Sequence, residues 1–335
     1  MDLTLSADQR ALQTGLRDVL ADLWSAEHLR EAAAGAAPGN KDWRSIAELG
    51  VFGVTVPEAE DGMGLGLADA AVLFEELGAA LVPGPLVPTA LAAGRVAGTI
   101  DGSAIVTMLD LRAPVLLVEH LDLATHVVAL DADGLRVLPA DALDATPVQT
   151  PLDPLTPLWS VPGDVRDLGE RIGSAGEVAD WMRRGAVLNS ALQVGVARGA
   201  LDLAVRYSLE RVQFDRVIGG FQAVKHLLAD SLVRVDVSRA AVLVAALTVD
   251  DPPAAEADEA AEAVAAAKVL ADEAATLGGR SGLQVHGGMG FTWEVLAHLY
   301  LKRAWVLETS FGSADEHAEF LATKGSGVGG VGASG

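Results

Sequence analysis

Residues 207–222 read YSLERVQFDRVIGGFQ and residues 284–292 read QVHGGMGFT. In the first stretch, Arg211 and Phe214 stand three residues apart at the predicted end of a helix, where such side chains share one face. The arginine offers a planar, permanently charged fork to a phosphate group, and the ring beside it can pack against an attached ring system. In the second stretch, Gly287 and Gly288 lack Cβ atoms, so their backbone can approach a phosphate closely.

Both motifs also have simpler interpretations. Arg211 could pair with a carboxylate on another helix of the same chain. Gly287, Gly288 and Gly290 could form only the C-terminal cap of a helix. The residues alone leave these alternatives open.

Helical periodicity surrounds the two motifs. Apolar residues recur at helical spacing in three long stretches, which predict helices over residues 178–211, 221–249 and 254–283. The Asp-Asp-Pro-Pro sequence at 250–253 stops the second helix before the third begins.

The earlier part of the chain has a different order of patterns. Residues 6–97 show helical spacing, interrupted by a short extended piece at 51–56, whereas residues 103–161 contain short β-branched runs separated by Asp, Gly and Pro. The sequence therefore predicts a mainly α protein with a small β domain. The predicted parts are an N-terminal helical domain (1–100), a short middle β domain (101–168), a C-terminal helical bundle (169–324) and a disordered tail (325–335).

Composition excludes several classes of protein. The chain has 335 residues, 50% of them hydrophobic, which is enough for two or three domains. A net charge of −22 repels nucleic-acid phosphates and anionic lipid surfaces. The sequence contains no cysteine, and it lacks both a secretory leader and the roughly 18 uninterrupted apolar residues of a membrane span. We therefore expect a cytoplasmic protein with no nucleic-acid or membrane partner.

Other candidate residues carry little functional signal. His226 and His286 stand alone and are better explained as structural residues. Gly62, Gly64 and Gly66 lack the G-x-G-x-x-G spacing of a nucleotide loop and predict a turn. No His, Asp and Glu grouping has metal-ligand spacing, so we predict no metal site.

Together with an N-terminal passage at residues 43–78, the two motifs resemble the acyl-CoA dehydrogenase family. That family carries R-x-x-F-G-x-x-I-x-x-F-Q, Q-x-x-G-G-x-G-[FY] and LAELG…VPE…GG.G…EELG, and counterparts occur in family order between Ser6 and Ala322. The resemblance implies an N-terminal helical domain, a middle β domain and a C-terminal four-helix bundle. It also implies dimers, or dimers of dimers, with FAD at the dimer interface.

The resemblance implies that this chain contacts an FAD held mainly by a neighbouring subunit. The implied contact residues are Arg211, Gln213, Phe214, Ile218, Phe221, Gln222, Gln284, Val285, Gly287 and Gly288. Asp215 replaces the glycine of the family motif and places an acid beside the pyrophosphate, which weakens the case for anion binding.

The family's catalytic base is missing from both of its known positions. The reaction removes a proton α to a thioester carbonyl while a hydride leaves the β carbon for the flavin, so a carboxylate must accept the proton. The usual Glu lies 27 residues beyond the Gln of the Q-x-x-G-G turn, where this chain has Phe311. The alternative position, 26 residues before the motif arginine, is Gly185. Glu308 lies near Phe311, but a helical offset of three residues points it elsewhere, so we interpret it as a solvated or ion-paired residue.

The middle region also departs from the family pattern. No T-E-P-x-A-G-S-D passage, which holds the flavin ring and the thioester in the family, occurs between residues 100 and 165. The chain thus keeps a half-site for a partner's FAD and lacks its own.

This combination suggests a heteromeric enzyme. The sequence looks similar to the smaller, non-catalytic subunit of actinobacterial acyl-CoA dehydrogenases of steroid side-chain degradation, which contain two unlike chains. That similarity implies a catalytic partner subunit in an α2β2 heterotetramer, an acyl-CoA substrate, and an electron-transferring flavoprotein as acceptor. A self-sufficient homomeric dehydrogenase with an unrecognised base and a non-redox scaffold of the same fold are the alternatives.

Overall fold

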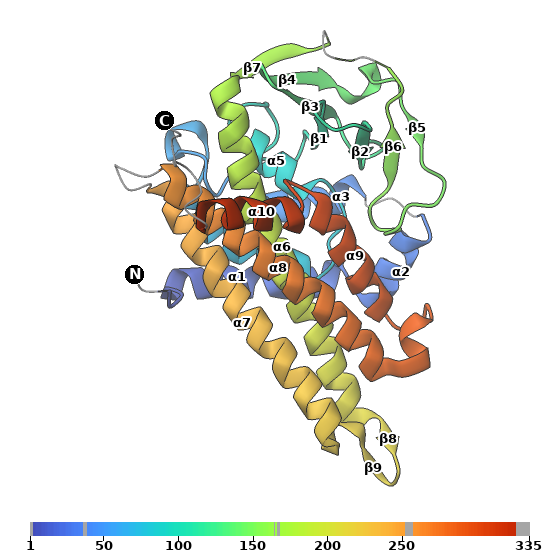
Figure 1. Cartoon of the computed structure of the whole chain (residues 1–335). Coiled ribbons are helices and arrows are strands. Elements are labelled where there is room, and N and C mark those ends of the chain that lie inside the picture. Colours follow the sequence, from blue (N-terminus) through green and yellow to red (C-terminus); the bar gives the residue numbers. More distant parts are fainter. Residues whose placement is uncertain (1–2, 36–38, 164, 166–167, 252–256, 326–335) are drawn as a thin grey trace, which may run out of the picture.

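The computed structural model describes residues 3–35, 39–163, 165, 168–251 and 257–325. Helices precede and follow a central group of strands, as the sequence predicts (Figure 1). The N-terminal helices are α1 (Ala7–Leu23), α2 (Ala26–Ala33), α3 (Asn40–Glu48), α4 (Leu67–Ala79) and α5 (Leu86–Ala92). The strands that follow are β1 (Val106–Asp110), β2 (Leu117–Glu119), β3 (His126–Asp131), β4 (Gly134–Pro139), β5 (Thr146–Pro147), β6 (Leu158–Ser160) and β7 (Glu170–Ser174). The C-terminal elements are α6 (Ala175–Glu210), β8 (Val212–Gln213), β9 (Arg216–Val217), α7 (Gln222–Asp250), α8 (Ala257–His286), α9 (Ala297–Thr309) and α10 (Ala314–Gly325).

Hydrogen bonds from side chains fix the starts of the N-terminal helices. Ser6 and Gln9 form a capping box at α1, in which each side chain accepts from the other's backbone N–H, at 3.0 and 2.9 Å. The Asp250 carboxylate at the end of α7 accepts from the backbone N–H of Leu67. This contact caps α4 and ties the N-terminal helices to the bundle.

The extended piece predicted at 51–56 is instead a series of turns. Gly50 adopts φ +79°, and Gly53 donates its N–H to the Gly50 carbonyl at 3.0 Å. The valines of this segment are buried by side-chain packing, not by strand pairing. The prediction of an extended piece is therefore wrong. A short run of apolar residues indicates burial, which does not distinguish a turn from a strand.

The strands of the middle region, β1 to β7, form two small sheets. One has the order β1-β3-β4-β7, with β1 and β3 parallel and the other pairs antiparallel, and the second has the order β2-β6-β5. β7 lies within the range predicted as helical bundle, so the predicted boundary at residue 169 comes one strand too early. The helix begins only at Ala175, after Ser174 donates its N–H to the Glu177 carboxylate at 2.8 Å.

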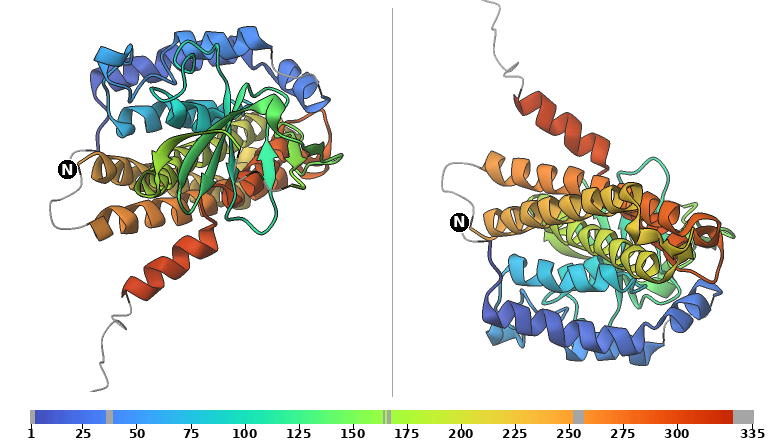
Figure 2. Two further views of the ribbon diagram at one scale, coloured as in Figure 1. Left: turned by 90° about the horizontal axis from the view of Figure 1, so that it is seen from above. Right: turned by 90° about the horizontal axis from the view of Figure 1, so that it is seen from below.

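The C-terminal bundle consists of α6, α7, α8 and α9. The first three match the predicted ranges to within a few residues at each end, and α9 has no predicted range. Helix α4 crosses α6 closely, because a Cβ atom at Gly195 would lie only 2.0 Å from the Glu75 carbonyl oxygen. Helix α10 projects away from the bundle (Figure 2). Gly325, predicted as the first tail residue, is the last residue of α10, and residues 326–335 lie outside the described residues.

Arg303 on α9 connects the three parts of the chain. Its buried guanidinium donates to the Asp153 carboxylate at 2.6 Å, to the Val82 carbonyl at 3.1 Å and to the Leu155 carbonyl at 3.3 Å. A buried, fully paired arginine of this kind fixes the relative positions of the segments that it joins. None of the helices in the described ranges combines the length and apolarity needed to cross a bilayer.

Candidate functional site

The first sequence motif forms a hairpin at the far end of the bundle (Figure 1). Strands β8 and β9 are joined by Phe214 and Asp215, at φ 53° and 61°. Two residues in the left-handed region suit the twist of a tight hairpin, although this backbone is unfavourable for a phenylalanine. The prediction that Arg211 and Phe214 share a helix face is therefore wrong, because α6 ends at Glu210 and Arg211 is already extended.

The hairpin side chains face away from the bundle. Phe214 is 87% exposed, and no other described residue forms a hydrogen bond or ion pair with the exposed Arg211 guanidinium. The guanidinium of Arg216 lies 3.9 Å from the centre of the Phe221 ring, which meets the Phe214 ring edge-on at 6.1 Å. Pairing with a residue in the described ranges therefore does not explain Arg211, whose charge is open to another molecule.

The second motif forms the end of α8. Gly287 has φ +58°, which matches the helix-cap interpretation. Gly288 has no positive φ, and a Cβ atom there would meet nothing within 4 Å. Gly290 is buried, and a Cβ atom there would come 3.0 Å from the Leu283 side chain. Only Gly288 thus lacks a reason within the chain to be glycine, and the space beside it is open.

Contacts between α6 and α8 bring the two motifs to the same end of the bundle. The ring of Tyr207 stacks on His286 with centroids 4.4 Å apart, and its hydroxyl lies 3.6 Å from the Met289 sulfur. His286 also makes a 2.7 Å hydrogen bond between its Nδ1 and the Gly282 carbonyl. Burial lowers the pKa of His286, so the ring is a neutral structural residue at pH 7.

The remaining predicted contact residues share this end and differ in exposure. Gln213, Gln222 and Gln284 are exposed, Ile218 and Phe221 are half-buried, and Val285 is buried. Gln213 donates to the Val212 carbonyl at 2.8 Å, so this amide is partly occupied.

A cavity of about 930 Å³ lies elsewhere, between the β region and the bundle. Its walls come from the start of α5, from β1 and β2, and from α6 and the end of α9. Phe311, which motif spacing predicts to stand at the usual position of the family's base, forms part of the wall.

The Phe311 ring occupies the space beside Gly185. A Cβ atom at Gly185 would lie 2.2 Å from both Cδ1 and Cε1 of that ring. Since real Cβ contacts never approach so closely, no larger residue fits at 185 while the ring is there. The two positions that could carry a base are therefore filled by one apolar pair.

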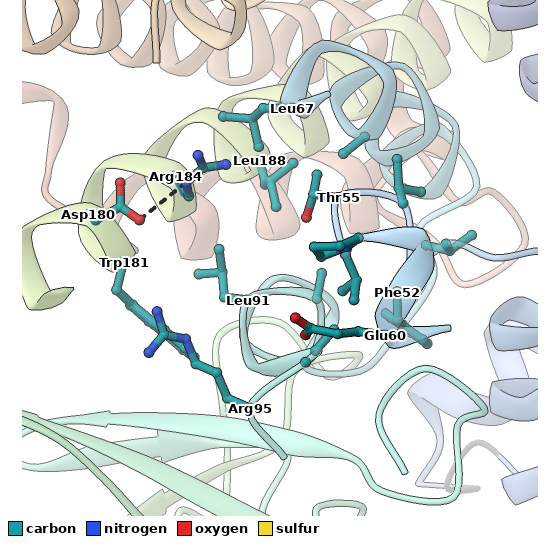
Figure 3. A pocket seen from close by; sticks show the side chains of 18 of the residues that line it. Phe52, Thr55, Glu60, Leu67, Leu91, Arg95, Asp180, Trp181, Arg184 and Leu188 are labelled. Atoms are coloured by element: carbon teal, nitrogen blue, oxygen red, sulfur yellow. Dashed lines mark hydrogen bonds and ion pairs between the residues drawn. The ribbon is translucent and has the colours of Figure 1, made fainter. Parts of the chain in front are cut away.

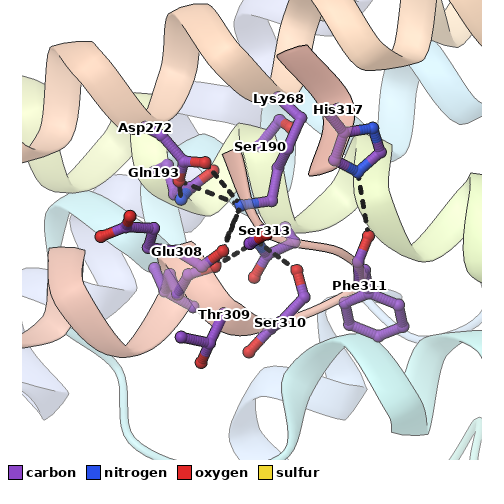
Figure 4. Close-up of polar contacts among 12 residues, drawn as sticks. Ser190, Gln193, Lys268, Asp272, Glu308, Thr309, Ser310, Phe311, Ser313 and His317 are labelled. Atoms are coloured by element: carbon purple, nitrogen blue, oxygen red, sulfur yellow. Dashed lines mark hydrogen bonds and ion pairs between the residues drawn. The ribbon is translucent and has the colours of Figure 1, made fainter. Parts of the chain in front are cut away.

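The loop that carries Phe311 is held by hydrogen bonds (Figure 4). Phe311 and Gly312 have φ 58° and 92°, and His317 Nε2 donates to the Phe311 carbonyl at 3.2 Å. Asn189 on α6 donates to the Leu307 carbonyl at 2.8 Å, just before the loop. The unfavourable backbone of Phe311 therefore persists because its surroundings determine it.

A buried ion pair supports the same loop. Lys268 is fully buried, pairs with Asp272 at 2.8 Å and donates to the Leu307 and Glu308 carbonyls at 3.2 and 3.0 Å. Burial raises the pKa of Asp272 to about 7, although Lys268 opposes the shift. Sequence reasoning missed this pair. Its one signal is the i, i+4 spacing of a lysine and an aspartate in an Ala-rich helix.

Glu308 is not placed to act as a substitute base. It is absent from the cavity wall, and its carboxylate points away from the Phe311 ring (Figure 4). Glu308 therefore lies outside this cavity, as its predicted three-residue helical offset from Phe311 implies.

Four carboxylates line the cavity of about 930 Å³, and three of them have a partner within the chain. The engaged carboxylates and their partners are Asp110 with Arg112, Asp153 with Arg303, and Glu316 with the backbone N–H of Ser313. Glu119 is half-buried and forms no ion pair with a described residue. Burial raises the pKa of Glu119 to about 7. Sequence reasoning missed Glu119, because nothing around a single Glu in a short strand marks it.

A smaller cavity of about 370 Å³ lies between residues 51–60 and the first turns of α6 (Figure 3). Its charged side chains are largely paired. Arg95 contacts Glu177 at 2.7 Å, and Arg184 contacts Asp180 at 3.2 Å. None of the predicted site residues lines this cavity.

The hairpin end of the bundle and the cavity of about 930 Å³ differ in how well their side chains would suit FAD. The hairpin end offers an unpaired arginine beside an open glycine backbone, a donor set suited to a pyrophosphate. The large cavity has Asp110, Glu119, Asp153 and Glu316 around a single arginine, Arg112. Such an acidic lining disfavours a phosphate or a reduced, anionic flavin. Within the described ranges, no three His, Asp or Glu side chains gather closely enough to hold a metal ion.

Comparisons with known proteins agree with this architecture. Residues 6–100 match the family described as "Acyl-CoA dehydrogenase, N-terminal domain", and residues 178–325 match "Acyl-CoA dehydrogenase, C-terminal domain". Acyl-CoA dehydrogenase IpdE2 of Mycolicibacterium smegmatis is 38% identical over 273 residues, which cover 78% of this chain and 80% of that protein. The chain belongs to the acyl-CoA dehydrogenase family.

Two further relatives differ in length and in closeness. Acyl-CoA dehydrogenase FadE34 of Mycobacterium tuberculosis is 37% identical over 307 residues, which cover 82% of this chain but only 41% of that protein. A solved variant of the Tcur3481-Tcur3483 steroid ACAD superposes with a TM-score of 0.81 at 24% identity, covering 96% of this chain and 99% of the other. The structural likeness at this low identity shows a shared fold.

Proposed function

We propose that this chain is the non-catalytic subunit of a heteromeric, FAD-dependent acyl-CoA dehydrogenase. In this proposal the partner subunit supplies the base that removes the α proton of the acyl-CoA. The observation that carries the proposal is the Phe311 ring packed on Gly185, since neither position can accept a proton. The complex would be an α2β2 heterotetramer of the cytoplasm that passes electrons to an electron-transferring flavoprotein.

In this role the chain's own contribution is binding and orientation. Arg211 would pair with the FAD pyrophosphate, and Phe214 would pack against the adenosine part. The open backbone at Gly287 and Gly288 would approach a phosphate. The supporting contacts would come from Gln213, Ile218, Phe221, Gln222, Gln284 and Val285. FAD, when bound, supplies the hydride acceptor of the reaction.

Two features of the relatives support a two-chain enzyme. The match covers 41% of FadE34, so more than half of that protein lies outside the match and has room for a second chain of this size. The Tcur3481-Tcur3483 protein carries two chain names and is described as a steroid ACAD. We extend the steroid class to this chain's acyl-CoA on that basis and on the sequence resemblance. The organisation into 1–100, 101–168 and 169–324 remains part of the proposal, with β7 assigned to the middle domain.

Flavin content tests the proposal. The chain is produced alone and together with a candidate catalytic acyl-CoA dehydrogenase subunit, and flavin absorbance is measured per folded chain. We expect a folded but nearly colourless chain alone, and a yellow complex with one FAD for each pair of unlike chains. About one flavin per chain in the isolated protein would favour a self-sufficient homomeric enzyme. A colourless complex would favour a non-redox scaffold.

A further inference from the structure

The cavity in front of Phe311 has walls that suit a hydrocarbon. Leu86 and Val87 come from α5, Met182 and Leu192 from α6, and Trp305 and Phe311 from the C-terminal part. A concave space of about 930 Å³ with mostly apolar walls and a few polar groups is the usual form of a small-molecule site.

The charges around this cavity offer an anion no partner. Arg112 is the one cation among its lining residues, and it is engaged twice by Asp110, at 2.8 and 2.7 Å. Asp153 is paired with the buried Arg303, and Glu316 adds a negative charge. Without a free cation in the described lining, the phosphates of a nucleotide or of CoA find no partner here.

Glu119 gives the cavity one hydrogen-bonding group. It is half-buried on β2, where Thr107 Oγ1 donates to its backbone carbonyl at 2.6 Å. Burial raises the pKa of Glu119 to about 7, while Arg303 lowers it and Asp153 raises it further. The adjacent His120 is buried and has a pKa of about 3, so it stays neutral. As the pH falls below about 7, Glu119 therefore becomes protonated and able to donate to a carbonyl or hydroxyl oxygen.

The part of the wall that carries Phe311 is held in place. Hydrogen bonds from His317, Asn189 and Lys268 hold the segment around Phe311, and the ring itself rests on Gly185. A site whose wall is already fixed loses little conformational freedom when a ligand enters.

We propose that this cavity binds a neutral, largely hydrocarbon ligand that carries a carbonyl or hydroxyl oxygen, with Glu119 as the hydrogen-bonding group. The ligand is held without being oxidised, a point that rests on the proposed non-catalytic role of this chain. The non-catalytic subunit therefore keeps a binding site for an uncharged ligand, separate from the FAD contacts at the hairpin.

Fluorescence titration of the assembled complex tests the inference with two probes. Nile red is neutral, polycyclic and carries a carbonyl, whereas anilinonaphthalene sulfonate is a similar-sized anion. The variants Met182→Trp and Leu117→Trp fill the cavity from two walls, and Leu168→Trp adds the same ring to an exposed site outside it. We expect one class of Nile red site to weaken at least tenfold in both filling variants and to stay unchanged in the control. Equal affinity in all three, or displacement of Nile red by the sulfonate at similar concentration, overturns the proposal.

Glu119→Gln provides a second readout. In the unmodified complex, Nile red affinity should fall several-fold between pH 6 and pH 8, as Glu119 ionises and can no longer donate. The amide cannot ionise, so the variant should bind with little pH dependence. An unchanged pH dependence in the variant would overturn the role of Glu119.

Flavin content and turnover of the same samples separate this inference from the proposed function. A yellow, active complex that lacks a Nile red site in this chain refutes the cavity site alone. A complex that binds Nile red in this cavity but contains no flavin refutes the proposed function alone.

Discussion

The Phe311 ring lies against the backbone of Gly185, so close that a Cβ atom there would come 2.2 Å from two ring carbons. Phe311 follows α9 and Gly185 lies within α6. Motif spacing predicts that they stand at the two positions where the family carries its base. The ring requires a glycine at 185, because any side chain there would clash with it. A carboxylate at position 185 would therefore have to displace the ring.

This contact predicts strong coupling between substitutions at the two positions. Gly185→Ala should destabilise the chain by about 2 kcal/mol, because the added methyl group overpacks the site. In a Phe311→Ala background the same change should cost little, since the ring is gone. Urea denaturation of the four proteins measures the coupling.

Gly176→Ala is the matched control for this cycle. It lies on the same helix, where the nearest atom that a Cβ would meet is the Ser174 hydroxyl at 4.0 Å. It should be neutral or slightly stabilising in both backgrounds. If Gly185→Ala costs the same with and without the ring, the two residues are not coupled and the packing explanation is wrong.

Arg211 is predicted to hold FAD in the assembled complex. Arg211→Ala should weaken FAD binding by about 2 kcal/mol, which is roughly 30-fold, because a charge-assisted pair with phosphate is lost. The measurement is FAD affinity by titration of the stripped complex. Arg10→Ala removes another exposed arginine, on α1, and should leave the affinity unchanged. Equal affinity in the two variants would make Arg211 a surface residue only.

Glu76 is predicted to stabilise the fold in a pH-dependent way. Burial opposes its ionisation, but hydrogen bonds from Arg17 at 2.9 and 3.0 Å and from Arg198 at 2.7 Å outweigh burial, so the pKa of Glu76 is lowered. A lowered pKa in the folded state means that ionised Glu76 contributes stability above about pH 4.5, and that this contribution is lost as the pH falls through the folded-state pKa.

Glu76→Gln should therefore destabilise the chain by about 3 kcal/mol at pH 7, because Arg17 and Arg198 lose a buried partner. The difference from the unmodified chain should shrink below about pH 4. Denaturation midpoints at several pH values measure this. Glu273→Gln, which breaks the exposed pair with Arg234, should cost at most about 0.5 kcal/mol. A pH-independent loss at Glu76 would contradict the electrostatic explanation.

The sequence was sufficient to predict the order of helices and strands, because long amphipathic stretches carry a clear period. It failed where local conformation depends on contacts made elsewhere. The Phe214-Asp215 turn contains neither Gly nor Asn, the residues that normally mark a tight hairpin, so the chain was predicted to stay helical through Arg211. β7 has too little alternation to reveal that it pairs with β4.

Site prediction shows the same division. Motif spacing predicts roles for Phe311, Gly185 and the exposed hairpin residues, because spacing can be read along the chain. The Lys268–Asp272 pair and Glu119 were missed, since their importance comes from burial beside segments distant in sequence. A lysine and an aspartate at i, i+4 spacing, or a single glutamate in a strand, are also common on exposed surfaces, so the sequence does not mark them as buried.

The catalytic base is predicted to come from the partner subunit and not from position 311 of this chain. Phe311→Ala should cost about 3 kcal/mol of stability or more, because a buried ring is removed. It should nevertheless leave the chemistry of the assembled complex largely intact, since the ring accepts no proton. Phe311→Glu should create no second active site, because the cavity beside it is acidic and suits neither a flavin nor another carboxylate.

Acyl-CoA-dependent bleaching of the flavin decides between the two chains as the source of the base. Bleaching should continue in complexes that carry Phe311→Ala, Phe311→Glu or Glu308→Gln, and should slow by at least about 10²-fold when the partner subunit's own catalytic carboxylate is replaced by an amide. Glu308→Gln serves as the matched control, because its carboxylate lies next to the same loop but points away from the cavity. If the partner variant still bleaches at the normal rate while Glu308→Gln abolishes the reaction, the base belongs to this chain. A homomeric dehydrogenase would then explain the structure better than a heteromeric one.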